Sequence, residues 1–554
     1  MAENIFDYEK SEEKDMRRAG ILLPIFSLPG KYGIGCFSKN AFDFIDFLKE
    51  SGQKYWQILP VGPTGYGDSP YQTFCSFAGN PYFISLETLI EEGLLDKKKV
   101  DKVYKDCSDD RIDYEMLYNT RFTVLHDAYE SAKKKNYKRA KAYKSFEEDN
   151  AEWLTDYALF MSLKDEMGGI SFTEWPEELR VRDEKALKQA SKRLAEEISF
   201  YKFLQYKFYG QWEVVKKYAN DKGIDIIGDL PIYVSPDSAD AWAHPELFQL
   251  DKNARPKAVA GCPPDGFTPL GQLWGNPLYD WNYHNKTGYA WWISRIDKCR
   301  KLYDIIRIDH FRGFDEYYSV PAGDTDARGG HWVKGPGMKL FRAIKKSLGE
   351  IRIIAEDLGY TTDTVRKLVK DSGFPNMKIL EFAFYRDEND DGEHEFLPCN
   401  HYANCVVYTG THDNETLMGW LKGIEDDVYE RMSDYLGYEP ELKTVSKCKK
   451  KAAKCASQEV ERTPEVIAEE SKFVRSEEEL HILADKMIRA AHGSVADYCI
   501  LPVQDYLYLD NSARINAPST LGNNWVWRID KKDMNACLSG KIRKLTDIYD
   551  RLEA

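Results

Sequence analysis

Three carboxylates follow apolar, strand-like segments of this chain. Asp309 ends Ile-Ile-Arg-Ile-Asp, Glu356 follows Ile-Ile-Ala, and Asp413 follows Val-Val-Tyr-Thr-Gly-Thr-His. Because the C-terminal ends of parallel strands converge on one face of a barrel, we expect these side chains to meet there. A single acidic residue after a strand often caps a helix or pairs with an arginine. Three such segments in one chain favour a shared site instead.

A pair of carboxylates suits the cleavage of a sugar acetal. One carboxylate attacks or stabilises the anomeric carbon, and the other donates a proton to the leaving oxygen. Arg307 is expected to lower the pKa of Asp309 and to keep that carboxyl ionised. The carboxyl that acts as the general acid must instead stay protonated, through burial or through a nearby negative charge. Asp357 adjoins Glu356, but adjacent strand residues point to opposite faces, so we expect a structural role for it.

Two loops rich in Gly and Pro, residues 60–71 and 261–277, are candidates for sugar binding. Gly and Pro set specific backbone conformations, so such a loop can keep its shape without a hydrophobic core. The chain is rich in aromatic residues, with 13 Trp, 35 Tyr and 26 Phe. Tyr and Trp of these loops could stack on pyranose faces, while Ser69 and Asn276 could bind hydroxyl groups. The alternative is that the loops only pack over the barrel.

Two histidines, His310 and His412, adjoin the candidate carboxylates. Neither belongs to a His/Cys cluster with metal-ligand spacing, and no Gly-x-x-x-x-Gly-Lys nucleotide loop occurs. We therefore expect both histidines to contact sugar. We expect neither a metal nor an organic cofactor.

Seven apolar runs could form the strands that position these residues. They span residues 55–61, 224–232, 305–311, 351–358, 377–382, 405–411 and 499–507. Continuous apolarity is typical of strands that are covered on both faces, as in parallel sheets. Helical patterns, such as residues 41–49 and 361–371, lie between many of them. This alternation predicts an α/β fold.

Two long charged segments interrupt the alternation, at about residues 86–200 and 422–490. The first shows helical periodicity at residues 114–134 and 146–166, and the second contains a lysine-rich run at 447–455. That run could bind an anionic partner, but a solvated helix face is the expected interpretation. We predict that both segments are helical insertions on one catalytic barrel spanning residues 1–554.

Composition narrows the class of protein and its compartment. The net charge of −14 disfavours binding to nucleic acid. The 11 cysteines form no Cys-x-x-Cys pair, which favours thiols in a reducing cytosol over a disulfide scaffold. The acidic first residues do not resemble a secretory signal, and the apolar stretch 20–28 is too short to span a membrane. We expect a cytoplasmic protein without nucleic-acid or membrane partners; its oligomeric state is not indicated.

The strand-end segments resemble the conserved segments of the α-amylase clan. These are Arg-Ile-Asp-His-Phe-Arg-Gly (307–313), Ala-Glu-Asp-Leu-Gly (355–359) and Thr-His-Asp-Asn (411–414). A fuller set resembles the 4-α-glucanotransferases, or amylomaltases, of glycoside hydrolase family 77. It comprises Gly-Tyr-Gly-Asp-Ser-Pro-Tyr (65–71), Gly-Asn-Pro-Tyr (79–82), Gly-Asp-Leu-Pro-Ile-Tyr (228–233), Trp-Ala-His-Pro (242–245) and Gly-Gln-Leu-Trp-Gly-Asn-Pro (271–277). The match runs from about residue 18 to about residue 528.

The resemblance implies a (β/α)8 TIM barrel with large, mainly helical insertions and no separate C-terminal β-domain. It also implies that Asp309 is the nucleophile and that Glu356 is the general acid and base. Asp413 would be the third carboxylate, which grips sugar hydroxyls and favours a distorted ring.

The resemblance implies substrate contacts as well. Arg307 and His412 match positions beside the −1 sugar, and Asp229 matches an acidic residue near the same subsite. The other expected contacts are Tyr71, Asp265, Trp274, Ser69, Asn276, His310 and Asn516, with Tyr66 at a secondary glucan site. Ser519 stands where the family commonly has Gly.

The implied reaction transfers part of a malto-oligosaccharide or starch chain to another glucan, with retention of the α-1,4 linkage. A covalent intermediate requires carboxyl groups about 5–5.5 Å apart, which we expect for Asp309 and Glu356. A lid at residues 263–274 would favour a sugar acceptor over water. The alternatives are an α-glucan hydrolase of the same clan and a glucan-binding barrel without catalysis.

Overall fold

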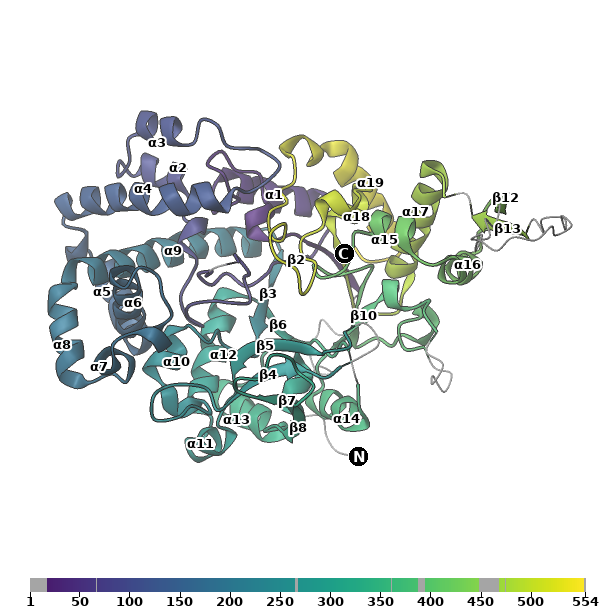
Figure 1. Ribbon diagram of the computed structural model, residues 1–554. Coiled ribbons are helices and arrows are strands. Elements are labelled where there is room, and N and C mark those ends of the chain that lie inside the picture. Colours follow the sequence, from purple (N-terminus) through teal and green to yellow (C-terminus); the bar gives the residue numbers. More distant parts are fainter. Residues whose placement is uncertain are drawn as a thin grey trace, which may run out of the picture.

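A computed structural model describes residues 17–552 except 66, 265–267, 360, 387–393, 448–467 and 474. Eight parallel strands close into a barrel, surrounded by helices (Figure 1). In order around the barrel they are β1 (Arg18–Leu22), β14 (Tyr498–Pro502), β11 (Cys405–Tyr408), β10 (Asn376–Ile379), β9 (Ile353–Ala355), β6 (Ile305–Asp309), β3 (Asp225–Pro231) and β2 (Tyr55–Gln57). The predicted (β/α)8 barrel is confirmed.

Side chains alternate along each strand between the barrel interior and the helical layer. In β6, Ile305 belongs to the interior cluster, whereas Ile306 and Ile308 join the larger core outside the barrel. Arg307 and Asp309 share the face of Ile305, because strand side chains repeat every second residue. The inner face of β6 thus changes from apolar to charged toward its C-terminal end.

All seven predicted strands occur, although each is shorter than its apolar run. The run at 499–507 divides into β14 and the short helix α18 (Val503–Tyr506). The sequence did not reveal β1, whose five residues lie partly within the apolar stretch 20–28. β1 pairs with β14 and β2 and so closes the barrel.

Helices that follow the strands cover the outside of the barrel. They include α1 (Lys39–Glu50), α12 (Ala290–Leu302), α13 (Met338–Leu348), α14 (Asp363–Ser372), α15 (Leu417–Gly423) and α19 (Ala536–Ile548). Their sequences specify their ends. Ser38 caps the first turn of α1, and Thr362 caps α14. Gly373 ends α14 in the left-handed conformation that glycine adopts readily.

A group of helices lies between β2 and β3 and projects from one side of the barrel (Figure 1). It comprises α2 (Leu86–Glu91), α3 (Lys97–Val103), α4 (Tyr114–Lys134), α5 (Lys141–Asp149), α6 (Ala151–Glu166), α7 (Glu177–Arg180), α8 (Glu184–Arg193) and α9 (Ala195–Asp221). The long helix α9 packs against both α6 and α1, and so connects this group to the barrel. The periodicity at 114–134 coincides with α4, and that at 146–166 covers parts of α5 and α6.

The second charged segment is only partly helical. It contains α16 (Asp426–Tyr435) and α17 (Glu477–Gly493), but also an antiparallel hairpin of β12 (Leu442–Lys447) and β13 (Ala468–Phe473). The expectation of helix was wrong for these two strands. The β-branched pair Thr444 and Val445 favours extended backbone. The lysine-rich run lies outside the described residues, apart from Lys447 at the end of β12.

A four-stranded antiparallel sheet, which the sequence did not reveal, stands beside the barrel. Its order is β5 (Gln272–Pro277), β4 (Ala258–Cys262), β7 (Glu316–Pro321) and β8 (His331–Lys334). It joins the segment after β3, which also contains α10 (Ala239–Ala243) and α11 (Trp281–Lys286), to the segment after β6. The sheet places Thr268, Gly271 and Trp274 beside the strand ends. After β14, the described residues form helices and loops, without a C-terminal β-domain.

Candidate active site

A cleft of about 2900 Å³ opens at the C-terminal ends of the barrel strands. Asp309 at the end of β6, Glu356 just after β9 and Asp413 in the loop after β11 all line it. The barrel thus brings together three carboxylates that are far apart in the sequence. Within the described ranges, no group of three or more His, Cys, Asp or Glu side chains is arranged to hold a metal ion.

Glu356 is buried and accepts two backbone hydrogen bonds. His310 N–H donates to its Oε2 at 2.6 Å, and Leu358 N–H donates to its Oε1 at 2.9 Å. Burial raises the pKa of Glu356 to about 6, although the charge of Arg307 and the two N–H donors lower it. A carboxyl with this pKa can exchange a proton near neutrality, as a general acid and base must. Asp357 instead accepts hydrogen bonds from Asn376 and Met377 of β10, which is a structural contact.

Asp309 lies against a buried guanidinium. Its Oδ1 is 3.2 Å from Arg307 Nη1, and the same nitrogen lies 2.6 Å from Asp229 Oδ2. Burial raises the pKa of Asp309, Arg307 lowers it, and Glu356, Asp229 and Asp413 raise it. Arg307 therefore acts in the expected direction, but the net direction of the pKa shift is upward. One guanidinium does not offset both burial and three nearby carboxylates.

The Asp309 side chain nevertheless keeps 27% of its surface exposed to the cleft. Water and a substrate can therefore reach it. Because the charge of Glu356 raises the pKa of Asp309, the pair retains a proton more readily than two separate carboxylates would.

Tyr71 connects Asp229 to His412. The Tyr71 hydroxyl donates to Asp229 Oδ2 at 2.8 Å and lies 2.8 Å from His412 Nε2. Its only proton goes to Asp229, so its oxygen is free to accept one from His412 Nε2. Burial lowers the pKa of His412, which favours the neutral imidazole. The two rings stack with their centroids 5.4 Å apart, and this packing fixes the orientation of the imidazole.

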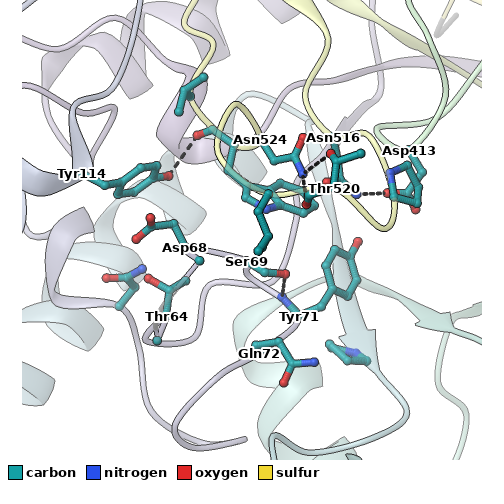
Figure 2. Close-up of a pocket in the computed structure, with 18 of the residues that line it drawn as sticks. Thr64, Asp68, Ser69, Tyr71, Gln72, Tyr114, Asp413, Asn516, Thr520 and Asn524 are labelled. Carbon is teal, nitrogen blue, oxygen red and sulfur yellow. Dashed lines mark hydrogen bonds between the residues drawn. The ribbon is translucent and has the colours of Figure 1, made fainter. Parts of the chain in front are cut away.

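Asp413 is held from two sides by the segment after β14. Asn516 Nδ2 donates to Asp413 Oδ1 at 2.6 Å, and Arg514 Nη2 donates to its backbone carbonyl at 2.8 Å. Figure 2 shows Asn516 pointing toward Asp413. His412 Nε2 lies 3.3 Å from Asp413 Oδ2. These contacts orient the third carboxylate toward the cleft.

Other expected contacts line the cleft in different ways. The Trp274 and His310 rings meet edge to face, with centroids 4.8 Å apart. The Asn276 amide already donates to the Val234 carbonyl, so this group shapes the cleft wall. Ser69 Oγ accepts from Tyr71 N–H at 3.3 Å (Figure 2).

Two expected contacts, Tyr66 and Asp265, lie outside the described residues.

His310 Nε2 is buried and has no hydrogen-bond partner among the described residues. Burial, with a smaller effect of Arg312, lowers the pKa of His310 to about 3. A neutral imidazole nitrogen at the cleft wall is therefore available to a sugar hydroxyl.

Two further carboxyl groups line the cleft, although neither was selected as a site residue from the sequence. Asp68 lines the cleft beside Ser69, and burial raises its pKa to about 6 (Figure 2). Glu381 also lines the cleft and follows β10. The rule that selected the other strand-end carboxylates could have found Glu381, because it ends the apolar run Met-Lys-Ile-Leu.

Ser519 lines the same cleft in a strained backbone conformation. Its φ is +62°, in the left-handed region that favours glycine. The backbone of this loop therefore keeps the conformation that glycine would adopt at this position.

Comparisons with known proteins show the family of this chain. The family model described as 4-alpha-glucanotransferase, glycoside hydrolase family 77, matches residues 23–533. The 4-alpha-glucanotransferase of Clostridium butyricum is 45% identical over 530 residues, which cover 96% of this chain and 100% of the relative. That of Thermus thermophilus is 42% identical over 540 residues, with coverages of 97% and 99%.

A solved structure gives the same result. The amylomaltase from Streptococcus agalactiae in complex with acarbose superimposes with a TM-score of 0.85 at 37% identity, covering 97% of this chain and 100% of that one. The chain belongs to the 4-alpha-glucanotransferase family, glycoside hydrolase family 77.

Proposed function

We propose that this chain transfers a segment of an α-1,4-glucan from one malto-oligosaccharide or starch chain to the 4-hydroxyl of another glucan or of glucose. The observation that carries this proposal is the pair of Asp309 and Glu356 on adjacent strands of one cleft. One carboxyl is partly exposed beside a guanidinium, and the other is buried with a pKa of about 6.

In the first half of the reaction, Asp309 attacks the anomeric carbon of the donor. The bond to the 4-oxygen of the leaving chain breaks, and Glu356 donates its proton to that oxygen. The result is a covalent glucosyl-Asp309 ester. Arg307 supports this step because its charge lies beside the attacking carboxylate and stabilises the ionised form.

In the second half, the ionised Glu356 takes the proton of an incoming 4-hydroxyl. The acceptor oxygen attacks the anomeric carbon, and Asp309 leaves as a carboxylate. Two inversions at the same carbon retain the α linkage. One glycosidic bond is broken and one is formed, so the number of reducing ends stays constant.

Asp413 and the Tyr71 network, which consists of Tyr71, Asp229 and His412, act on the sugar that reacts. Asp413 Oδ2 lies near His412 Nε2. It would accept hydrogen bonds from sugar hydroxyls and favour a distorted sugar ring. His412, Arg307 and Asp229 surround the same subsite, because a single chain of contacts joins them. Trp274 and His310 form another part of the cleft wall, where an aromatic face can stack on a pyranose ring.

Transfer requires that a sugar, rather than water, reach the ester. We infer that residues 263–274, the lid expected from the sequence, favour a sugar acceptor over water; Trp274 of β5 lines the cleft. A hydrolase of the same clan, or a barrel that only binds glucan, would use the same cleft without this preference.

Products from maltotriose distinguish these activities. The proposal predicts glucose together with longer malto-oligosaccharides and almost no gain in reducing ends. A hydrolase would release glucose and maltose with a steady gain in reducing ends. Unchanged maltotriose, with a folded protein that binds it, would leave only glucan binding.

We also propose a single catalytic domain over residues 1–554, with insertions at about 86–200 and 422–490, and a cytoplasmic location. Described cysteines such as Cys36, Cys75 and Cys299 are free thiols, which fits a reducing compartment. In the described part of the chain, no helix has the length and apolarity that crossing a membrane requires. We expect no nucleic-acid partner, because the net charge is −14.

A further inference from the structure

A second pair of buried carboxyl groups lies beneath the loop that carries Asp413. Glu381 follows β10 and is 3% exposed, and Asp505 of α18 is 1% exposed. Thr409, just after β11, contacts both residues. Its carbonyl accepts from Glu381 N–H at 3.1 Å, and its hydroxyl donates to Asp505 Oδ2 at 2.5 Å. The proposed reaction uses neither carboxyl, so their burial needs a separate explanation.

The Glu381 carboxyl packs directly against the backbone of the Asp413 loop. A Cβ at Gly410 would lie 2.7 Å from Glu381 Oε1, so only glycine fits at this position with the carboxyl in place. Oε1 is buried and has no hydrogen-bond partner among the described residues. A buried carboxyl oxygen without a partner costs free energy, so its presence calls for an explanation.

Asn414 connects Glu381 to the turn that presents Asp413. The Asn414 side-chain oxygen accepts from Thr411 N–H at 2.9 Å and from the Thr411 hydroxyl at 2.8 Å. Both bonds use its oxygen, so its amide N–H groups remain for the Glu381 carboxyl, whose pKa this contact lowers. Asp413 N–H donates to the same Thr411 hydroxyl at 3.3 Å.

The charges around Glu381 come from three other segments. Burial raises its pKa well above the usual value, and Asp505 of α18 and Glu415 of the β11 loop raise it further. The only cation among these effects is Arg514 of the segment after β14, which lowers the pKa but is also bonded to Asn516 and Asp413 carbonyls. The net effect favours the neutral carboxyl.

We propose that Glu381 is a positioning residue for Asp413. The Glu381 carboxyl supports Gly410 and Asn414 from below and holds the turn so that the Asp413 side chain faces the cleft. The neutral carboxyl acts as a spacer and hydrogen-bond partner. Ionisation would place a negative charge beside Asp505 and Glu415 and would disturb the turn. The inference rests on the proposed function, because it requires that Asp413 take part in transfer.

Three variants test this role with maltotriose as the donor. Glu381→Ala removes the support and is expected to lower kcat by about 10²-fold, the loss that a small misplacement of a catalytic group can cause. KM should change less. Glu381→Gln keeps the shape of the neutral carboxyl and should keep kcat close to that of the unmodified protein. Glu479→Gln changes a buried glutamate of α17 outside the cleft lining and should leave kcat unchanged.

The ratio of kcat for the unmodified protein to kcat for Glu381→Gln isolates the titration of Glu381, because Glu356 titrates in both proteins. The pKa of Glu381 is raised, so its carboxyl is neutral below that pKa and ionises above it. This ratio of kcat values should be constant at acidic pH and should fall at alkaline pH. A folded Glu381→Gln protein with kcat reduced 10²-fold, or a ratio that stays flat to high pH, would overturn the neutral role.

A double-mutant cycle with Asp413→Asn tests whether Glu381 acts through Asp413. We expect Glu381→Ala to cost about 10²-fold in kcat when Asp413 is present and little when Asp413 is already Asn. Full additivity in folded proteins would overturn the proposal, and so would unchanged kcat in Glu381→Ala. If Glu381→Ala does not fold, the pH dependence of Glu381→Gln decides.

Failure of the positioning role and failure of the proposed function give different results. If the unmodified protein makes longer malto-oligosaccharides but the cycle is additive, only the role of Glu381 is wrong. If the unmodified protein shows no transfer from maltotriose, the proposed function itself is wrong.

Discussion

His310 donates its backbone N–H to Glu356 Oε2 at 2.6 Å, which ties the residue after Asp309 to the candidate acid. The bond is possible because His310 adopts a left-handed conformation, with φ of +53°, as the chain turns at the end of β6. Backbone donors do not change rotamer, so this contact fixes the position of the Glu356 carboxyl relative to β6. It also limits how far burial can raise the pKa of Glu356.

The pKa of Glu356 leads to a prediction for the pH dependence of transfer. Its pKa is raised to about 6, so the carboxyl is protonated below that pH and loses its proton above it. The first half of the reaction needs the protonated form. We expect kcat/KM for maltotriose, which reports on the free enzyme, to fall as pH rises above about 6. A profile that stays flat from pH 6 to 9 would contradict the assignment of Glu356 as the acid.

Glu356→Gln removes the proton donor and keeps the shape of the side chain. We expect kcat for maltotriose to fall by about 10²–10⁴-fold, the usual contribution of general acid–base catalysis. A donor with a leaving group that needs no proton, such as a maltosyl fluoride, should form the covalent ester at a nearly normal rate. Equal losses with both donors would show that the variant damages something other than proton transfer.

Tyr71→Phe removes the hydroxyl between Asp229 and His412. His412 Nε2 then loses one partner in a buried site, whereas Asp229 keeps its contact with Arg307. An unsatisfied buried polar group costs about 1–3 kcal/mol, so we expect a clear decrease in Tm and a loss of kcat. The ratio of transfer to hydrolysis is the second measurement. Unchanged Tm and kcat would show that the network has no energetic role.

Ser519→Gly tests backbone strain in the loop beside Asn516. The left-handed conformation costs a non-glycine residue about 1–2 kcal/mol, and the greater freedom of unfolded glycine offsets about 0.5–1 kcal/mol of the gain. We expect the free energy of unfolding to rise by up to about 1.5 kcal/mol. Ser519→Val, with a branched side chain at the same φ, should lower it. Chemical denaturation of both variants measures the difference, and a glycine variant less stable than the valine variant would contradict the account.

Much of the barrel can be predicted from local sequence, because strands covered on both faces are continuously apolar. The meeting of the three carboxylates could also be predicted, because the C-terminal ends of parallel strands converge on one face of a barrel. The four-stranded sheet could not be predicted. It pairs β4 with β7 of a different barrel segment, and such long-range pairing leaves no local periodicity.

The net shift of the Asp309 pKa could not be predicted from the sequence for a related reason. The sequence shows Arg307 two residues away, but not how many other carboxylates converge on the same site. Burial, Glu356, Asp229 and Asp413 together outweigh one guanidinium. Local neighbours predict the sign of one interaction, whereas the net pKa depends on the complete three-dimensional site.

The central claim is that Asp309 forms a covalent bond with the donor sugar. A fluorinated glucosyl donor that slows breakdown of the ester, followed by proteolysis and mass spectrometry, tests it most directly. The account predicts that the glucosyl mass is found on the peptide containing Asp309 and that Asp309→Asn is not labelled. Labelling of another carboxylate, or rapid transfer by a folded Asp309→Asn protein, would contradict it.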